Sequence, residues 1–172
     1  KRMLERKRKL DCANGREKAD LVLKNGNVLN VFTEEVLKAD VAICGDTIVG
    51  VGEYEGKEEI DCTGKYLVPG FIDAHMHIES CMAAPGVLAK VVAKAGTTTI
   101  IADPHEIVNV SGTKGMDYFL KCAAKLLVNV FFMVPSAVPA TDVETNGCGE
   151  FLASDMMKYV DNARVLGLGE TM

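Results

Sequence analysis

Residues 66–102 read YLVPGFIDAHMHIESCMAAPGVLAKVVAKAGTTTIIA, and this stretch carries the first signs of the fold. The apolar run Tyr66–Asp73 is typical of a buried strand. Apolar residues then recur at helical spacing over Ala84–Ala95, which predicts a helix. The β-branched run Thr97–Ala102 predicts the next strand. Strand, helix and strand in this order indicate parallel strands joined by a helical crossover.

The same alternation continues toward the end of the sequence. It predicts helices over Gly115–Leu127 and Phe151–Val160, and strands over Val128–Val134 and Arg164–Gly169. The strands begin about 30 to 36 residues apart, so eight such units need roughly 260 residues, the usual size of a (β/α)8 barrel. Residues 66–172 are therefore predicted to be α/β, the first half of a TIM-type barrel. A doubly wound sheet is the competing fold, but no glycine-rich nucleotide-binding motif follows any predicted strand.

Short β-branched runs fill residues 19–65 and predict strands. These strands are expected at Asp20–Lys24, Asn27–Phe32, Val36–Cys44, Thr47–Val51 and Glu58–Cys62. Asn25-Gly26 and Gly45-Asp46 are typical of two-residue hairpin turns, because glycine readily adopts positive φ. The pattern predicts an antiparallel meander, part of a small β-sandwich-like domain. A meander of this size buries too little surface to stand alone, so it must pack on something else.

Residues 1–18 are polar and helix-prone, and we expect a short N-terminal helical arm anchored by Met3, Leu4 and Leu10. Six of the first nine residues are Lys or Arg, whereas the whole chain has a net charge of −5. A solvated face is the simpler interpretation of this basic run, and a patch for an anionic partner is the alternative. The remainder of the chain is acidic, which argues against nucleic-acid binding.

Other features of the composition point to a cytoplasmic protein. No run approaches the ~18 consecutive apolar residues of a membrane helix, and the charged N-terminus is unlike a secretory signal. The six cysteines include no C-x-x-C pair, which fits reduced thiols better than disulfides or a zinc ribbon.

Two histidines follow the first strand of the predicted barrel. Because side chains alternate along a strand, Asp73, His75 and His77 are expected on one side, where the two imidazoles can bind one metal ion. The alternative is a histidine pair satisfied by hydrogen bonds in a polar barrel mouth. Glu79 comes two residues later, and we expect it to support the site or to face solvent rather than to bind metal.

Two further strand ends carry candidate residues. His105 and Glu106 follow the second strand, where barrel enzymes build their active sites, and are predicted to contact substrate or move protons. The alternative is an Asp-Pro turn that caps the next helix. Glu170 follows the fourth strand, and a carboxylate there could face His75 and His77 and bridge two cations. The proline-rich loop 135–145 is consistent with a pocket wall.

Four stretches of the chain resemble the prokaryotic adenine deaminases of the amidohydrolase superfamily. They are PGFIDAHMHIES (69–80), IIADPHEI (100–107), VFFMVPSAVPAT (130–141) and VLGLGET (165–171). The first identifies only the superfamily, whereas the second and third are more specific. The start DLVLKNGNVLNVFTEEVLKADVAI (20–43) also matches these enzymes, so the resemblance covers nearly all of residues 10–172. Relative to the family pattern, Cys81 replaces an expected serine and Gly169 an expected alanine.

The resemblance implies a binuclear divalent metal centre, commonly Mn²⁺ and alternatively Fe²⁺, that hydrolyses adenine to hypoxanthine and ammonia. His75 and His77 match metal ligands, and Glu170 matches the bridging carboxylate, where many relatives use a carboxylated lysine. The remaining ligands and the aspartate that acts as general acid/base are expected beyond Met172. The resemblance also implies a purine-base substrate and a homo-oligomer at full length.

Other functions stay open. The chain could act on a cyclic amide or an acetylated sugar, or it could be a non-catalytic fragment that needs the rest of the barrel or another subunit, because half a barrel leaves open strand edges. The zinc-dependent nucleobase deaminases with a P-C-x-x-C motif are excluded, since that motif does not occur here.

Overall fold

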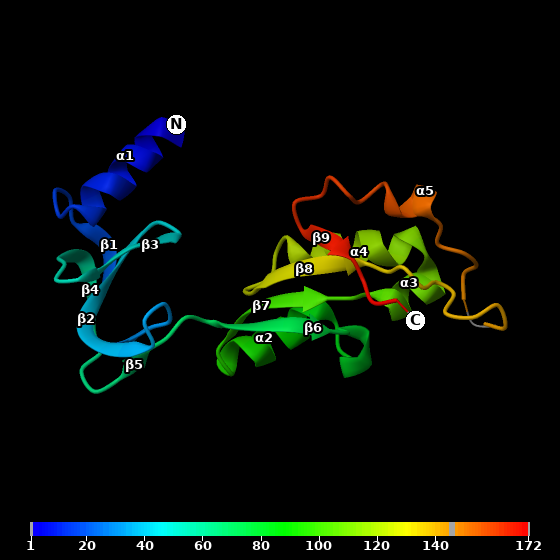
Figure 1. The fold of residues 1–172 in the computed structure, drawn as a ribbon, viewed down its shortest axis with the longest axis horizontal. Helices are drawn as coiled ribbons and strands as arrows, with labels where there is room; N and C mark the ends of the chain where they lie inside the picture. The colour runs from blue at the N-terminus through cyan, green and yellow to red at the C-terminus, as the bar shows by residue number, and fades with distance from the viewer. Residues whose placement is uncertain (1, 145–146, 172) are drawn as a thin grey trace. The chain divides into compact units, whose positions relative to one another are not determined.

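The structure is a computed structural model that describes residues 2–144 and 147–171. The chain divides into two compact units, with the boundary between Pro69 and Gly70 (Figure 1).

The first unit is one helix and a five-stranded mixed sheet. Its elements are α1 (Arg2–Ala13), β1 (Ala19–Asn30), β2 (Glu35–Cys44), β3 (Thr47–Gly52), β4 (Gly56–Asp61) and β5 (Tyr66–Leu67). The strand order is β3-β2-β1-β4, and β5 also pairs with β1. The β1-β2 and β2-β3 pairs are antiparallel, whereas β4 and β5 run parallel to β1. The prediction of a purely antiparallel meander is therefore wrong.

Asn25-Gly26 is not a hairpin turn, contrary to prediction. It lies inside β1 as a bulge, where the register with β2 shifts and Asn25 has a φ of 61°. The Asp40 carboxylate accepts the backbone N–H of Asn25 at 2.9 Å and so holds the bulge in place. Gly26 permits a close approach of Leu67, since a Cβ there would lie 2.4 Å from its Cδ1. The predicted turn at Gly45-Asp46 is confirmed, with Gly45 at a φ of 62°.

The helix α1 is held to its unit by charged side chains rather than by the expected apolar anchors. Arg8 forms ion pairs with Glu17 and Asp20. Met3, Leu4 and Leu10 are 83%, 72% and 62% exposed, so the prediction that they anchor the helix is wrong. The residue of the helix that is fully buried is Cys12, and burial raises the pKa of its thiol to about 11.

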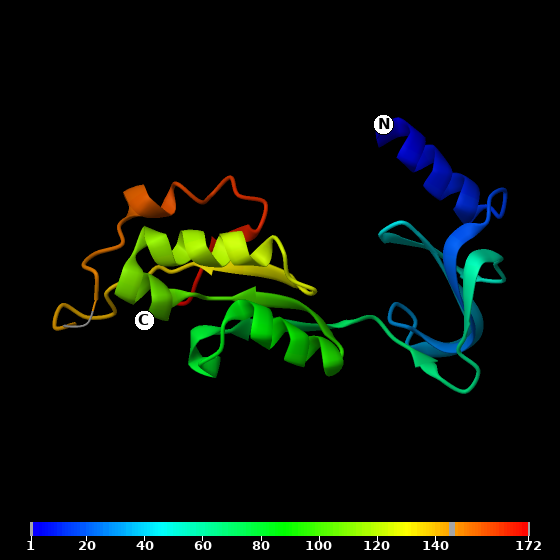
Figure 2. The ribbon, with the colours of Figure 1, turned by 180° about the vertical axis from the view of Figure 1, so that it is seen from behind.

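The second unit is a four-stranded parallel sheet covered by helices. Its elements are β6 (Phe71–Met76), the 3₁₀ turn η1 (Glu79–Cys81), α2 (Pro85–Lys94), β7 (Thr97–Ala102), α3 (His105–Ser111), α4 (Thr113–Ala123), β8 (Asn129–Val134), α5 (Ala153–Met156) and β9 (Val165–Leu168). The strand order β6-β7-β8-β9 follows the sequence. Figure 2 shows α2 and α4 on one face of the sheet. Sequential parallel strands with their crossover helices on one face fit part of a barrel rather than a doubly wound sheet.

Two predicted elements of this unit differ from the structure. The strand expected over Tyr66–Asp73 is two strands, β5 in the first sheet and β6 in the second, with Pro69 between them; proline lacks the N–H that a continuous ladder would need. The helix expected over Phe151–Val160 is the single turn α5. Beyond it, the backbone N–H groups of Lys158 and Tyr159 bond three residues back, so the chain forms turns instead of further α-helix.

The core of the second unit lies between the sheet and the helices. Ile100, Val130 and Phe132 from the strands are buried with Met116 and Phe119 from α4. Apolar residues elsewhere on the strands stay exposed: Phe71, Ile72, Leu166 and Leu168. None of the helices in the described part of the chain combines the length and apolarity that a bilayer crossing requires.

Candidate metal centre

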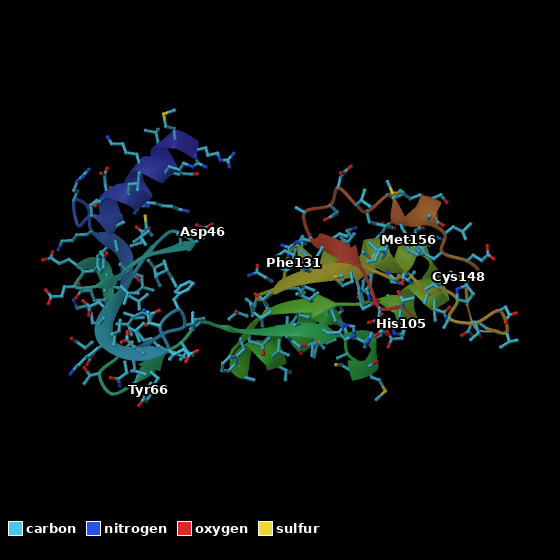
Figure 3. All side chains as sticks on the ribbon, viewed as in Figure 1. Asp46, Tyr66, His105, Phe131, Cys148 and Met156 are labelled. Carbon is cyan, nitrogen blue, oxygen red and sulfur yellow. The ribbon has the colours of Figure 1, made fainter. Side chains whose placement is uncertain are left out.

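The predicted site residues lie together at the carboxyl ends of the second unit's strands. They are His75, His77, His105, Glu106 and Glu170. His75 and His77 are at the end of β6. His105 and Glu106 begin α3, and Glu170 follows β9. Figure 3 shows His105 beyond the strand tips, beside the C-terminal segment.

Glu170 faces the histidine pair, as the strand-end argument predicts. The Nε2 atoms of His75 and His77 are 3.2 Å apart. The Glu170 carboxylate lies 3.4 Å from His75 Nε2 through Oε2 and 3.8 Å from His77 Nε2 through Oε1. These donors lie within 4.8 Å of one another. Imidazole nitrogen and carboxylate oxygen are usual ligands of divalent transition metals, so the donor set fits such an ion.

The orientation of His77 is set by its second ring nitrogen. Nδ1 lies 2.8 Å from the backbone carbonyl of Asp103, to which it donates its hydrogen. Nε2 then presents a lone pair toward Glu170, the arrangement typical of metal-ligating histidines. Burial lowers the pKa of His77, but the Asp103 carbonyl and the charges of Glu106 and Glu170 outweigh this, so the pKa is raised.

His105 and Glu106 add further polar atoms beside His77 and Glu170. His105 Nε2 lies 3.3 Å from Glu170 Oε1. Glu106 Oε1 accepts a hydrogen bond from Ser80 at 2.8 Å, whereas Oε2 is buried and has no hydrogen-bond partner among the described residues. His77, His105 and Glu106 also form a cluster of metal-ligand size. The Nδ1 hydrogen of His77 is donated to the Asp103 carbonyl, and Glu106 Oε2 lies 3.5 Å from the same nitrogen and 3.7 Å from His105 Nε2.

The sequence profile of the amidohydrolase family matches residues 66–166. The chain belongs to the amidohydrolase family. A curated relative, the adenine deaminase of Desulfitobacterium hafniense, is 58% identical over 158 residues, which are 92% of this chain and 28% of the relative. The chain thus spans about 28% of the length of that relative.

Solved amidohydrolase-like structures share the fold. The atrazine chlorohydrolase of Arthrobacter aurescens, in complex with zinc, aligns with a TM-score of 0.62 at 17% identity, over 86% of this chain and 46% of that one. A D-aminoacylase whose binuclear metal centre has been studied aligns with a TM-score of 0.52 at 24% identity, over 67% of this chain and 29% of that one. These alignments confirm a partial barrel preceded by a small β domain.

Two carboxylates of this amidohydrolase support the candidate site: Glu79, for which a supporting role was one of the two predictions, and Asp103, whose role sequence reasoning missed. Asp103 is fully buried, and its Oδ2 accepts the backbone N–H of Glu170 at 2.8 Å. Glu79 supports the site through α3, since its Oε1 accepts the N–H of Ile107 in the helix's first turn at 3.0 Å. Burial raises the pKa of Glu79. The Asp103 side chain makes no capping bond to α3 within the described residues, so the capping alternative does not describe it.

The family pattern predicts alanine at position 169, and the structure explains why glycine fits there in this amidohydrolase. A Cβ at this position would lie 2.1 Å from Asp103 Oδ2. The buried carboxylate therefore occupies the space that an alanine methyl group would need. In the neighbouring loop, Ser136 donates its hydroxyl hydrogen to the carbonyl of Glu170 at 2.8 Å, while residues 145–146 lie outside the described residues. The pocket-wall role of this loop stays a prediction.

Proposed function

We propose that the full-length protein is an adenine deaminase that hydrolyses adenine to hypoxanthine and ammonia. The observation that carries this proposal is the convergence of Glu170 on the His75–His77 pair at strand ends 95 residues apart in the sequence. The similarity to an adenine deaminase over 92% of the chain supports the choice of substrate. A ring-opening or deacetylating amidohydrolase would need the same metal ligands, so only the substrate separates these alternatives.

His75, His77 and Glu170 would bind divalent cations, with Mn²⁺ the first choice and Fe²⁺ the second. When bound, two such cations supply Lewis acidity that lowers the pKa of water at the site to near neutrality. Glu170 would hold these cations through its two carboxylate oxygens, of which Oε2 faces His75 and Oε1 faces His77. The Asp103 carbonyl holds the ring proton of neutral His77 on Nδ1, so that Nε2 is the nitrogen directed at the same point.

His105 and Glu106 are proposed to contact the purine. Adenine presents N–H groups on its ring and amino group, and the buried Oε2 of Glu106 is an acceptor that such a donor would satisfy. In the reaction, the oxygen of water bonds to C6 and the bond between C6 and the amino nitrogen breaks; one hydrogen of the water goes to that nitrogen, which leaves as ammonia, and the other goes to N1 of the ring. The general acid/base for these transfers is expected beyond Met172.

Several broader properties belong to the same proposal. A protein with this activity would serve purine salvage and adenine catabolism in the cytoplasm, as a homo-oligomer at full length. The 172 residues alone are proposed to be inactive, because β6 and β9 each pair with one neighbour among the described strands and leave an open edge.

The proposal is tested by removing metal from the full-length protein with a chelator, reloading it with Mn²⁺ and measuring ammonia release from adenine. His75→Ala should abolish the release. Lys158→Ala, which removes an exposed ion pair to Asp155, is the matched control and should keep parental turnover. Unchanged turnover in His75→Ala would overturn the metal assignment, and hydrolysis of a cyclic amide or an acetylated sugar in place of adenine would overturn the substrate.

A further inference from the structure

Asp103 lies where three strand ends of the site meet. It follows β7 directly and is 0% exposed. Its backbone N–H donates to the carbonyl of Met76 at 3.0 Å, at the end of β6. Its own carbonyl accepts the Nδ1 hydrogen of His77 at 2.8 Å. The backbone of Asp103 therefore fixes both the β6 tip and the ring of one candidate ligand.

The side chain of Asp103 reaches the other candidate ligand. Its Oδ2 accepts the backbone N–H of Glu170 at 2.8 Å, a contact that joins residues 67 positions apart. A second bond continues the β9 end toward β8, because the N–H of Gly169 donates to the carbonyl of Val134 at 2.7 Å. The carboxylate thus sets the position of the Glu170 backbone relative to β7, while β8 sets that of the preceding residue.

The approach of Asp103 to the β9 end depends on a missing side chain. A Cβ at Gly169 would lie 2.1 Å from Oδ2, 2.8 Å from Cγ and 3.0 Å from Oδ1. All three contacts fall on the carboxylate itself, which is buried and has little room to withdraw. In this chain the Asp103 carboxylate is seated against Gly169, and an alanine at this position would require the carboxylate or the end of β9 to shift.

We propose that Asp103 is a positioning residue whose carboxylate, seated against Gly169, holds Glu170 opposite the His75–His77 pair. The alternative, a local cap for α3, does not use this oxygen, because Oδ2 bonds to Glu170 instead. The deaminase readout below rests on the proposed function. The Mn²⁺-binding readout does not, so the two proposals can fail separately.

The test compares Asp103→Ala with Asp103→Asn in the full-length protein. Alanine removes the acceptor for the N–H of Glu170, and we expect Mn²⁺ affinity, measured by titration of the metal-free protein, to fall about 10- to 100-fold. Asparagine keeps a carbonyl oxygen for that bond. It replaces Oδ1, which has no hydrogen-bond partner among the described residues, by an NH₂ group of similar size. Its affinity should stay within about threefold of the parent.

The matched control is Asp40→Ala, which removes the other buried aspartate of the described chain, in the first unit. It should lower stability but leave the Mn²⁺ affinity of the folded protein unchanged. The deamination of adenine is measured in parallel at saturating Mn²⁺. We expect kcat to fall in Asp103→Ala and to recover in Asp103→Asn. A parent that binds Mn²⁺ but releases no ammonia from adenine would refute the proposed function and leave the positioning role standing.

A double-mutant cycle that combines Gly169→Ala with Asp103→Ala tests the contact between these two residues. A general loss of packing would not make the two effects depend on each other. In the parent, the added methyl group collides with the carboxylate and should weaken Mn²⁺ binding. In Asp103→Ala the carboxylate is gone, so Gly169→Ala should add little further loss.

Three outcomes would overturn the proposal. They are parental Mn²⁺ affinity in Asp103→Ala, equal losses in Asp103→Ala and Asp103→Asn, or strictly additive effects in the cycle. If Asp103→Ala does not fold, Asp103→Asn and Gly169→Ala still decide the matter: the first must keep its affinity for Mn²⁺ and the second must lose it.

Discussion

The two units differ in whether their buried side-chain oxygens have hydrogen-bond partners. In the first unit, Asp40 is 6% exposed and its carboxylate is fully engaged, with Lys24 Nζ at 2.5 Å and the N–H groups of Asn25 and Tyr54 at 2.9 and 3.2 Å. In the second unit, four buried side-chain oxygens have no hydrogen-bond partner among the described residues. They belong to Glu79, Asp103, Glu106 and Asn109.

Satisfied and unsatisfied groups indicate different uses. A buried polar group without a partner is costly, so a native structure keeps few of them and each needs an explanation. The first unit uses its buried carboxylate to close a bulge in a strand, which is a structural role. Two of the unsatisfied oxygens of the second unit belong to Asp103 and Glu106, which contact the candidate ligands, and there cations or substrate can supply partners.

The strongest way to test the structural side of this comparison is Asp40→Ala. The change leaves the ammonium of Lys24 and two backbone N–H groups without their acceptor. We expect a loss of about 3 kcal/mol in the free energy of unfolding of the first unit, at the low end for a broken buried pair because Lys24 keeps some exposure to water. Urea unfolding followed by circular dichroism measures the loss. A cost below about 1 kcal/mol would remove the contrast between the units.

Glu79→Ala tests the functional side with a smaller effect. It removes the acceptor for the N–H of Ile107 and loosens the first turn of α3, which carries His105 and Glu106. A lost bond of about 1 kcal/mol at the first turn of α3 corresponds to a rise of about fivefold in KM for adenine, with kcat less affected. Glu79→Gln, which keeps an acceptor oxygen, should restore most of the affinity. Steady-state kinetics in which Glu79→Ala matches the parent would show that α3 is held by other contacts.

The smallest effect is a pH dependence of the first unit. Burial raises the pKa of Asp40, but the hydrogen bonds from Lys24, Asn25 and Tyr54 outweigh it, so the folded-state pKa is lowered. A lowered carboxyl pKa contributes stability above the unfolded value of about 3.9, and this contribution is lost as the pH falls through the folded value. The stability difference between the parent and Asp40→Asn should thus be constant from about pH 7 to 5 and shrink below about pH 4. A difference that grows on acidification would contradict the assigned sign.

The candidate site was predictable where its residues obey local rules. Strand alternation brings His75 and His77 to one side, and the end of an apolar run marks the position of Glu170. Asp103 was not predictable in this way. An aspartate before proline is typical of a turn, and the bond that gives it a role crosses from β7 to the end of β9, which only the assembled sheet brings together.

The first unit shows the same limit in its backbone. Asn25-Gly26 is equally compatible with a hairpin turn and with a bulge, because both need a residue at positive φ. The choice depends on Asp40, 15 residues away, whose carboxylate bonds to the bulged backbone. Gly45-Asp46 also has distant partners, since Asp20 Oδ2 accepts the N–H of Gly45 and Lys9 pairs with Asp46, but these contacts leave the two-residue turn in place, and there the local prediction is confirmed.

The candidate ligands come from the two outer strands of the parallel sheet, with β7 and β8 between them. In a flat sheet, three strand spacings would separate β6 from β9 by about 14 Å. His75 Nε2 and Glu170 Oε2 nevertheless lie 3.4 Å apart, because both side chains reach across from their strand ends and the sheet of a barrel curls toward its axis. An ion bound by residues of both outer strands would link β6 to β9, and its binding energy would oppose any flattening of the half-barrel.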